Sequence, residues 1–216
     1  MITTDELVKK VRLLVNEPDD DAALNLLSED TRSIDSTIRG LLGDAVLFVQ
    51  QHKEQGAVNP KDYAPADGAL TDNGDGTGEI LLPVDFVELF QVQLKGWERP
   101  CTQLFPASSA VALAQGNVNT RGGCSRPVCV EGMNAEALPV MRYYSLPAGT
   151  VPVVQSFVYE AAFDEAVGLN TRPSNPLVQA VVYECAALLY NVFEKSAAAN
   201  NFMALALSWC KKERNS

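Results

Sequence analysis

The feature that most constrains the fold is a change in residue pattern near Asn59 and its reversal near Pro176. Outside this interval, apolar residues recur at the three- and four-residue spacing of helices. Inside it that spacing disappears, and prolines and glycines follow one another closely, at Pro60, Pro65, Gly68, Gly74, Gly76, Gly78 and Pro83. Because these residues interrupt helices and form turns, the pattern predicts an α+β fold. We expect a single domain over 1–216: a helical bundle formed by N-terminal helices (1–56) and C-terminal helices (172–216), with a β-rich insertion (57–171) between them.

The N-terminal part has the signals of two or three amphipathic helices. Thr3 and Glu6 have the spacing of a capping box, which predicts that the first helix begins there. A short helix is predicted over 22–27. Ser33 is predicted to cap a longer helix that ends near Gly56.

The insertion is predicted to consist mainly of strands. Residues 72–76 supply Asp, Asn and Gly, which tolerate positive φ, so a hairpin turn is expected between 69–70 and 79–82. Residues 85–89 are predicted to form one helical turn before a strand at 90–94, where apolar and polar residues alternate. The further elements expected are a short helix at 108–114, a loop at 116–127, and strands at 128–131, 139–144 and 151–159.

The C-terminal part is predicted to be helical after Pro176. A break is expected near Asn200 and Asn201, before a last helix that ends in the basic cluster at 211–214. The residues expected to form a shared core of the terminal helices are Leu7, Val11, Leu14, Ile38, Leu42, Val49, Val181, Leu188 and Val192.

The charge balance disfavours tight wrapping of nucleic acid. The chain has 17 Lys and Arg against 27 Asp and Glu, a net charge of -10, whereas phosphate neutralisation requires basic residues. Residues 1–56, 57–171 and 172–216 carry net charges of -5, -7 and +2, so only the C-terminal part is basic. The five cysteines are an odd number, and the polar start after Met1 has no signal-peptide pattern. Both features predict a protein kept in a reducing, cytoplasm-like compartment, and no apolar run has the length of a membrane span.

No segment of the sequence carries a convincing metal site. A calcium loop with its obligatory glycine at Gly76 would begin at Thr71 and end at Leu82, where a bidentate Glu is required. The residues at 72–76 are therefore expected to form only a hairpin turn. The acidic run at 19–21 is interpreted as a solvated helix cap.

Catalytic patterns are equally weak. Cys124 and Cys129, with Cys101, lack the paired spacing of a zinc site, so we expect small buried or loop thiols. His52 is the only histidine, and no nucleophile has a recognisable sequence signature around it. The sequence therefore predicts neither catalytic residues, nor a metal, nor a cofactor, and no disulfide needed for folding.

Several short segments together resemble one family. Leu82-Pro83-x-Asp85-Phe86, after a predicted strand, resembles a segment of the head-to-tail connector, or portal-adaptor, proteins of tailed bacteriophages. Other segments resemble the same family in their order along the chain. They are Leu42-x-x-Ala45 in an N-terminal helix, Gly96-Trp97-x-x-Pro100, Leu138-Pro139 to Pro147, and an alanine-rich helix at 178–192. The Cys124–Cys129 loop and the extension at 200–216 depart from the family pattern.

The resemblance implies a structural virion protein of the phage neck, assembled in the host cytoplasm, and not an enzyme. In such a family, a homo-oligomeric ring of about twelve copies lies under the portal protein, extends the DNA channel and presents a platform for a downstream tail or neck protein. An acidic channel wall would let DNA pass without sequence-specific binding, because carboxylates repel phosphate. No membrane association is implied.

The C-terminal end is the predicted docking site for the portal. It combines apolar anchors with the only basic cluster of the chain, although a solubilising helix terminus would have the same composition. The residues concerned are Phe202, Leu205, Trp209, Lys211, Lys212 and Arg214.

Three alternatives remain open from the sequence. One is a β-rich carbohydrate- or protein-binding module, in which Trp97, Tyr143, Tyr144 and Tyr159 would stack on sugar rings. The second is an enzyme, which the lack of an assembled catalytic set disfavours. The third is a different phage tail-completion protein.

Overall fold

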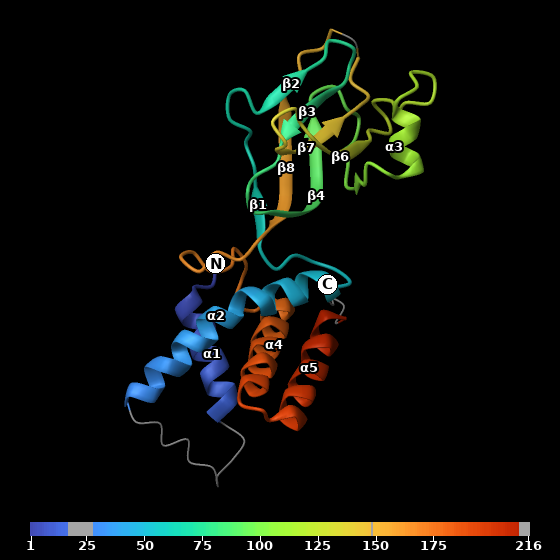
Figure 1. The fold of residues 1–216 in the computed structure, drawn as a ribbon. Coiled ribbons are helices and arrows are strands. Elements are labelled where there is room, and N and C mark those ends of the chain that lie inside the picture. Colours follow the sequence, from blue (N-terminus) through green and yellow to red (C-terminus); the bar gives the residue numbers. More distant parts are fainter. Residues whose placement is uncertain (17–27, 148, 212–216) are drawn as a thin grey trace. The chain divides into compact units, whose positions relative to one another are not determined.

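The computed structural model describes residues 1–16, 28–147 and 149–211 (Figure 1). The fold is α+β, as predicted, with N-terminal and C-terminal helices packed together and β-sheets between them in the sequence. The chain divides into two compact units. A helical unit comprises Met1–Pro60 and Ala162–Ser216, and a β unit comprises Lys61–Ala161, slightly shorter than the insertion predicted at 57–171. Whether the two units unfold together as one domain stays a prediction.

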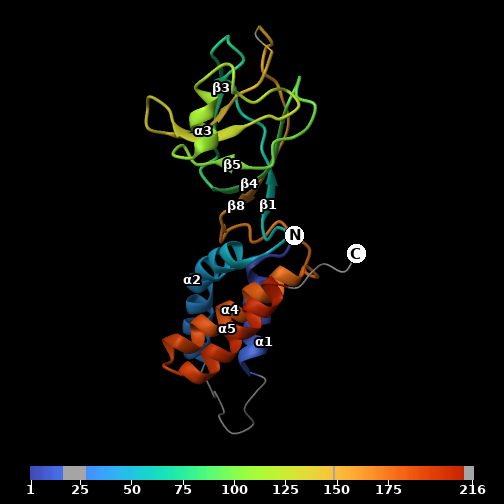
Figure 2. The ribbon, with the colours of Figure 1, turned by 90° about the vertical axis from the view of Figure 1, so that its right-hand side faces the viewer.

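The helical unit is built around one apolar helix. Within its described residues, 1–16, 28–60 and 162–211, four helices are present: α1 (Thr4–Asn16), α2 (Ser28–His52), α4 (Pro176–Val192) and α5 (Ser196–Cys210). Helix α4 contacts α1, α2 and α5, and Figure 2 shows α5 beside α4 from a second side. Only one residue of α4, Glu184, is charged, because almost every face of this helix is covered by a neighbour.

Local signals set the helix ends. The Thr3–Glu6 capping box is confirmed: the Thr3 N–H donates to the Glu6 carboxylate at 2.8 Å, and the Glu6 N–H donates to Thr3 Oγ1 at 3.3 Å. Helix α4 begins after Asn175, whose side chain accepts from the Leu177 N–H at 3.1 Å, and Pro176 follows in the first helical position.

Two predicted helix boundaries are wrong. Helix α2 begins at Ser28 and not at Ser33, since a helix N-terminus favours the acidic residues that follow Ser28 in the sequence. Helix α5 runs through Asn200 and Asn201 without a break. The chain turns earlier, at Glu194, which adopts a positive φ of 59°. The short helix predicted at 22–27 and the acidic run at 19–21 lie outside the described residues.

The predicted shared core is largely confirmed. Leu7, Val11, Ile38, Leu42, Val49 and Val181 are buried in one cluster, and Leu14 and Leu188 pack against it with partial exposure. Val192 is the exception, with 56% of its surface exposed. It is the last residue of α4, where the chain leaves the helix and turns into α5.

The described residues of the β unit form two sheets and one short helix. The three-stranded sheet has the order β1 (Pro60–Asp62), β8 (Val154–Ala161), β4 (Phe86–Leu94). The five-stranded sheet has the order β2 (Leu70–Asp72), β3 (Gly78–Leu81), β7 (Pro139–Tyr143), β6 (Cys129–Met133), β5 (Leu104–Phe105). Helix α3 (Ala110–Gln115) follows β5 and is capped by Ser109. The predicted hairpin at 72–76 and the short helix are confirmed.

The helical turn predicted at 85–89 is wrong, because β4 already begins at Phe86. Its pairing with β8 is irregular, with register shifts between Phe86 and Glu88, between Leu89 and Gln91, and between Gln93 and Leu94. Such bulges interrupt the two-residue alternation that identifies a strand in a sequence. The sequence of the first half of β4 therefore lacks the alternation of apolar and polar residues that would predict a strand.

Candidate functional site

The Leu82-Pro83-x-Asp85-Phe86 segment, on which the family resemblance mainly depends, leads from β3 of the five-stranded sheet into β4 of the three-stranded sheet. Val84 and Asp85 form a turn, after which Phe86 starts β4. The Asp85 carboxylate accepts two hydrogen bonds, from Lys61 Nζ at 2.6 Å and from Tyr159 Oη at 2.8 Å. Because Lys61 lies on β1 and Tyr159 on β8, this one carboxylate ties the start of β4 to both other strands of the sheet.

The hydrogen bonds to Lys61 and Tyr159 keep the Asp85 carboxyl group ionised. Burial opposes ionisation of Asp85, but the hydrogen bonds from Lys61 and Tyr159 outweigh it and lower the pKa of the carboxyl. Burial, and then the hydrogen bond to Asp85, raise the pKa of Tyr159. At neutral pH, Tyr159 is therefore a protonated donor and Asp85 an ionised acceptor. The trio acts as a structural brace, since neither group is poised to exchange a proton near pH 7.

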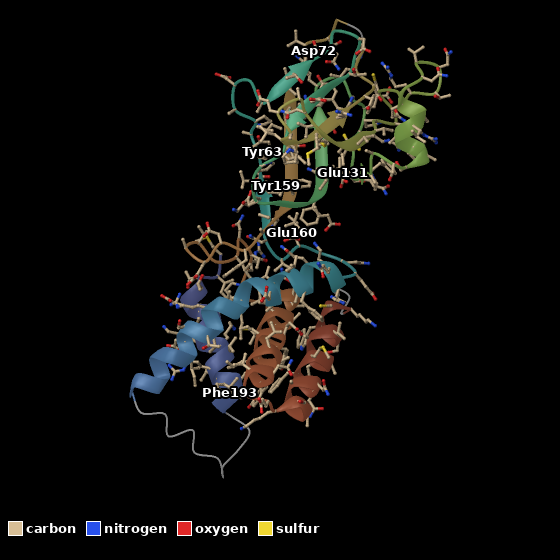
Figure 3. The ribbon with its side chains drawn as sticks, in the orientation of Figure 1. Tyr63, Asp72, Glu131, Tyr159, Glu160 and Phe193 are labelled. Atoms are coloured by element: carbon tan, nitrogen blue, oxygen red, sulfur yellow. The ribbon has the colours of Figure 1, made fainter. Side chains whose placement is uncertain are left out.

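Aromatic rings pack around the brace. Phe86 stacks on Tyr159 with ring centroids 5.8 Å apart, and Tyr63 meets Phe157 edge to face at 5.3 Å. Figure 3 labels Tyr63 and Tyr159, whose rings lie 6.4 Å apart. Aromatic pairs in this geometry contribute about 0.5–1.5 kcal/mol beyond their burial. Both conspicuous residues of the sequence segment, Asp85 and Phe86, therefore have a structural explanation.

Most of the aromatic rings that were candidates for stacking on sugars are buried. Trp97, Tyr143 and Tyr159 are buried in the β unit, with exposed fractions of 5%, 0% and 4%. Tyr144 is half-buried, and the Arg121 guanidinium lies 6.0 Å from its ring centre. A buried ring offers no face to a sugar, so three of these four rings are not available to stack on one.

The acidic hairpin turn uses its own carboxylates. Asp75 Oδ1 accepts from the N–H and the hydroxyl of Thr77, at 3.1 and 2.6 Å, and these bonds lower the pKa of Asp75. The other oxygen accepts from Arg121 at 3.2 Å, which ties the 116–127 loop to the turn. Gly76 has a φ of 84°, and a Cβ there would lie 2.0 Å from the Leu146 carbonyl oxygen, so the turn requires glycine.

Cysteine positions in the β unit differ from a metal site. Cys101 and Cys129 are buried, whereas Cys124 is half-buried and donates to the Ser145 carbonyl at 3.1 Å. Among the residues that the structure describes, no group of three or more His, Cys, Asp or Glu side chains is arranged to hold a metal ion.

The predicted docking residues do not share one face of α5. Phe202 packs inward, stacked on the rings of Tyr183 and Tyr190 at 6.2 and 5.3 Å, and Trp209 packs against the core of the helical unit. Leu205 is 43% exposed and Lys211 is exposed. Lys212 and Arg214 lie outside the described residues.

The sequence reasoning missed exposed apolar residues in both units. In the helical unit, Val192 and Phe193 are 56% and 46% exposed at the turn between α4 and α5, where Figure 3 labels Phe193. In the β unit, Leu113 of α3 and Val118 in the following loop are 74% and 75% exposed. An available signal was the run of apolar residues in α3, which is too long for a helix with one buried face.

Comparison with known proteins adds no family assignment: no family model matches the chain, and no curated protein has a similar sequence. In the described part of the chain, no helix has both the length and the apolar character needed to cross a membrane.

Proposed function

We propose that this chain is a structural virion protein of a tailed phage, which forms an oligomeric ring adaptor between the portal and the tail and extends the DNA channel. The observation that carries the proposal is the architecture: helices from the two ends of the chain form one unit, and the β-rich insertion forms another. This is the arrangement that the resemblance to portal adaptors implies. The role of Asp85 and Phe86 gives the shared segment a structural reason to be present.

Ring formation requires two different contact surfaces on each subunit. The exposed apolar side chains of the β unit, Leu113 and Val118, provide apolar area for a neighbouring subunit. In the helical unit, Leu205 and Lys211 face solvent and are available to a portal protein. The two pairs of residues belong to different units of the chain. This division is consistent with one surface that contacts ring neighbours and another that contacts the portal.

The charge of the β unit fits a channel that DNA crosses without adhering. Residues 61–161 contain eleven acidic and six basic residues, a net charge of -5. Carboxylates repel DNA phosphates, and this repulsion is screened beyond about 8 Å at physiological ionic strength. Weak binding of DNA is the property that sliding requires.

The deciding experiment is native mass measurement of the full-length chain, alone and mixed with the portal protein of the same phage. We expect a closed ring with a mass about twelve times that of the 23.3 kDa chain, and a larger complex when portal is present. A chain that stays monomeric at high concentration and does not bind portal contradicts the proposal. A ring that binds a tail protein but not portal would instead indicate a tail-completion protein.

Two variants locate the contacts. Leu113→Ser should weaken the ring, because it removes exposed apolar area, and should leave the folding of the unit intact. Leu205→Asp should weaken portal binding and leave the ring unchanged. Ser208→Ala, on the same helix, is the matched control, because Ser208 donates only to the Leu205 carbonyl of its own helix.

A further inference from the structure

The charges of the β unit are unevenly distributed along its sequence. Residues 95–130 contain four basic residues and one acidic residue, whereas the rest of the unit contains two basic and ten acidic residues. Arg99 and Arg126 are exposed and have no ion-pair partner among the described residues. The Glu98 N–H donates to the Cys124 carbonyl at 3.0 Å, which places the neighbouring Arg99 beside the loop that carries Arg126. The two arginines therefore form a basic area on an otherwise acidic unit.

Apolar side chains are exposed on the same segment. Leu113 of α3 and Val118 in the following loop are 74% and 75% exposed. The loop is held against α3, because the Thr120 hydroxyl donates to the Ala114 carbonyl at 2.6 Å. An interface commonly combines an apolar centre with a polar rim, and this segment supplies both. Four residues form what we call the loop surface: Arg99, Leu113, Val118 and Arg126.

An acidic counterpart lies at the turn between β6 and β7. Met133 and Leu138 are 61% and 41% exposed there. Glu131, labelled in Figure 3, and Glu136 are exposed and have no ion-pair partner among the described residues. The Asn134 side chain fixes the turn by accepting from the N–H groups of Glu136 and Leu138, at 3.0 and 2.9 Å. Four residues form what we call the hairpin surface: Glu131, Met133, Glu136 and Leu138.

The two surfaces are held toward opposite ends of β7. The hairpin surface directly precedes Pro139, the first residue of this strand. Just beyond the other end, the Ser145 carbonyl accepts from the thiol of Cys124 at 3.1 Å, and Arg121 lies 6.0 Å from the ring centre of Tyr144. Both Cys124 and Arg121 belong to the loop that follows α3. One subunit therefore presents two different surfaces, which a head-to-tail contact requires.

We propose that the hairpin surface of one subunit docks on the loop surface of a second copy of this chain. In this contact, the two carboxylates face the two guanidinium groups, and the apolar side chains of both surfaces form the centre. The inference rests on the proposed function and names the two faces of its ring contact. A second copy is the occupant that fits, because the chain itself carries a surface complementary in both charge and apolar character. DNA fits less well, since the loop surface joins its two arginines to exposed apolar side chains.

The test follows assembly of the full-length chain by native mass measurement over a range of concentrations. A hairpin variant carries Glu131→Arg with Glu136→Arg, and a loop variant carries Arg99→Glu with Arg126→Glu. Each variant alone brings like charges together, so the concentration needed for assembly should rise at least about tenfold. This defect should shrink at high salt, because salt screens the repulsion.

An equimolar mixture of the two variants is the decisive sample. The basic hairpin surface of the hairpin variant then meets the acidic loop surface of the loop variant. The acidic hairpin surface of the loop variant meets the basic loop surface of the hairpin variant. Mixing should therefore restore assembly, with the two variants alternating. Misfolded variants would not rescue one another in this way.

A matched control carries Asp62→Arg with Asp67→Arg. It changes the net charge as much as the hairpin variant does, at exposed acidic residues of the same unit that belong to neither surface. It should assemble like the wild type. Thermal unfolding of all three variants should stay close to that of the wild type, because the substituted side chains are exposed.

The outcomes separate this inference from the proposed function. If the wild type forms a ring and both variants assemble equally well, the inference is overturned and the ring stands. The inference is also overturned if mixing does not restore assembly, or if the variants lose only portal or DNA binding. Oligomers that follow the mixing rule but neither close nor bind portal would support the inference and contradict the proposed function. A wild type that stays monomeric overturns both.

Discussion

The helical unit and the β unit are held together by different forces. The helical unit depends on apolar packing: most of α4 is buried, and nearly all of the core side chains are aliphatic. In the β unit, polar contacts connect the strands in addition to apolar packing, including Lys61–Asp85–Tyr159 and the ion pair of Arg142 with Glu79 at 2.9 Å. The comparison teaches that one chain can combine a unit held mainly by apolar packing with one in which a few ionised carboxylates connect the strands.

Each unit has its own optical reporter, because the two tryptophans are divided between them. Trp97 lies in the β unit and Trp209 in the helical unit. Single-tryptophan versions made by Trp97→Phe or Trp209→Phe therefore report the unfolding of one unit at a time. Coincident transitions would also support the prediction of a single cooperative domain.

The largest expected effect is on the helical core. Leu42→Ala removes a fully buried side chain and should lower the free energy of unfolding by about 2–5 kcal/mol. Leu188→Ala, at a half-buried position, should cost about 1–2 kcal/mol. Denaturant unfolding followed by Trp209 fluorescence measures both values. If the two substitutions cost equally little, apolar packing does not dominate this unit.

The next largest effect should come from the brace of the β unit. Tyr159→Phe removes the hydroxyl that donates to Asp85 and should cost about 1–3 kcal/mol. Tyr144→Phe removes a hydroxyl from a half-buried ring of the same unit and serves as the matched control. Trp97 fluorescence during urea unfolding provides the measurement. Equal stability of the two variants would show that the brace contributes nothing.

The stability of the two units should change in opposite directions with pH. Hydrogen bonds from Lys61 and Tyr159 lower the pKa of Asp85 below its ordinary value of 3.8, so the folded β unit binds fewer protons than the unfolded one in that range. The contribution of Asp85 to the stability of the β unit is therefore present above about pH 4 and is lost as the pH falls through the pKa of the folded state. Asp85→Asn should remove this dependence on pH.

Glu184 acts in the opposite direction in the helical unit. It is buried, its Oε2 atom has no hydrogen-bond partner, and burial raises its pKa above the ordinary value of 4.5. The folded unit then binds more protons than the unfolded one, so its stability falls as the pH rises from about 4.5 through the folded pKa. Glu184→Gln should flatten this slope. Urea unfolding at several pH values, followed by the fluorescence of each tryptophan, measures how the free energy of unfolding of each unit changes with pH. A change in the same direction in both units would contradict the comparison.

The smallest expected effect is that of Lys211→Ala at the C-terminal end. Lys211→Ala should change the free energy of unfolding by less than about 0.5 kcal/mol, because the side chain is exposed. Trp209→Ala should lower it by more than about 2 kcal/mol, since the ring packs on its own core. Thermal unfolding measures both. Portal binding by the folded fraction of each variant then separates docking from stability, and unchanged affinity in both removes these residues from the docking prediction.

Much of the helical unit was predictable because its signals are local. The capping box at Thr3 and Glu6 and the start of α4 at Pro176 depend on residues a few positions apart. Val192 was misjudged because its helical spacing matches the buried face, whereas its exposure depends on where the next helix turns away. The start of β4 was misjudged because its bulges are created by pairing with β8, about seventy residues further along the chain.

The sequence by itself determined the alternation of helical and β-rich parts, the hairpin turn at 72–76, and the charge of each part, because periodicity, turn residues and charge are properties of neighbouring positions. The tertiary structure alone decided which residues meet across long separations. Asp85 could be recognised as part of a motif, but its partners Lys61 and Tyr159 become neighbours only when β1, β8 and β4 pair. In the same way, Cys101 and Cys129 are far apart in the sequence but belong to one apolar cluster of the β unit. They share it because the sheets bring distant segments together, and separation along the chain places no limit on such packing once the sheets have formed.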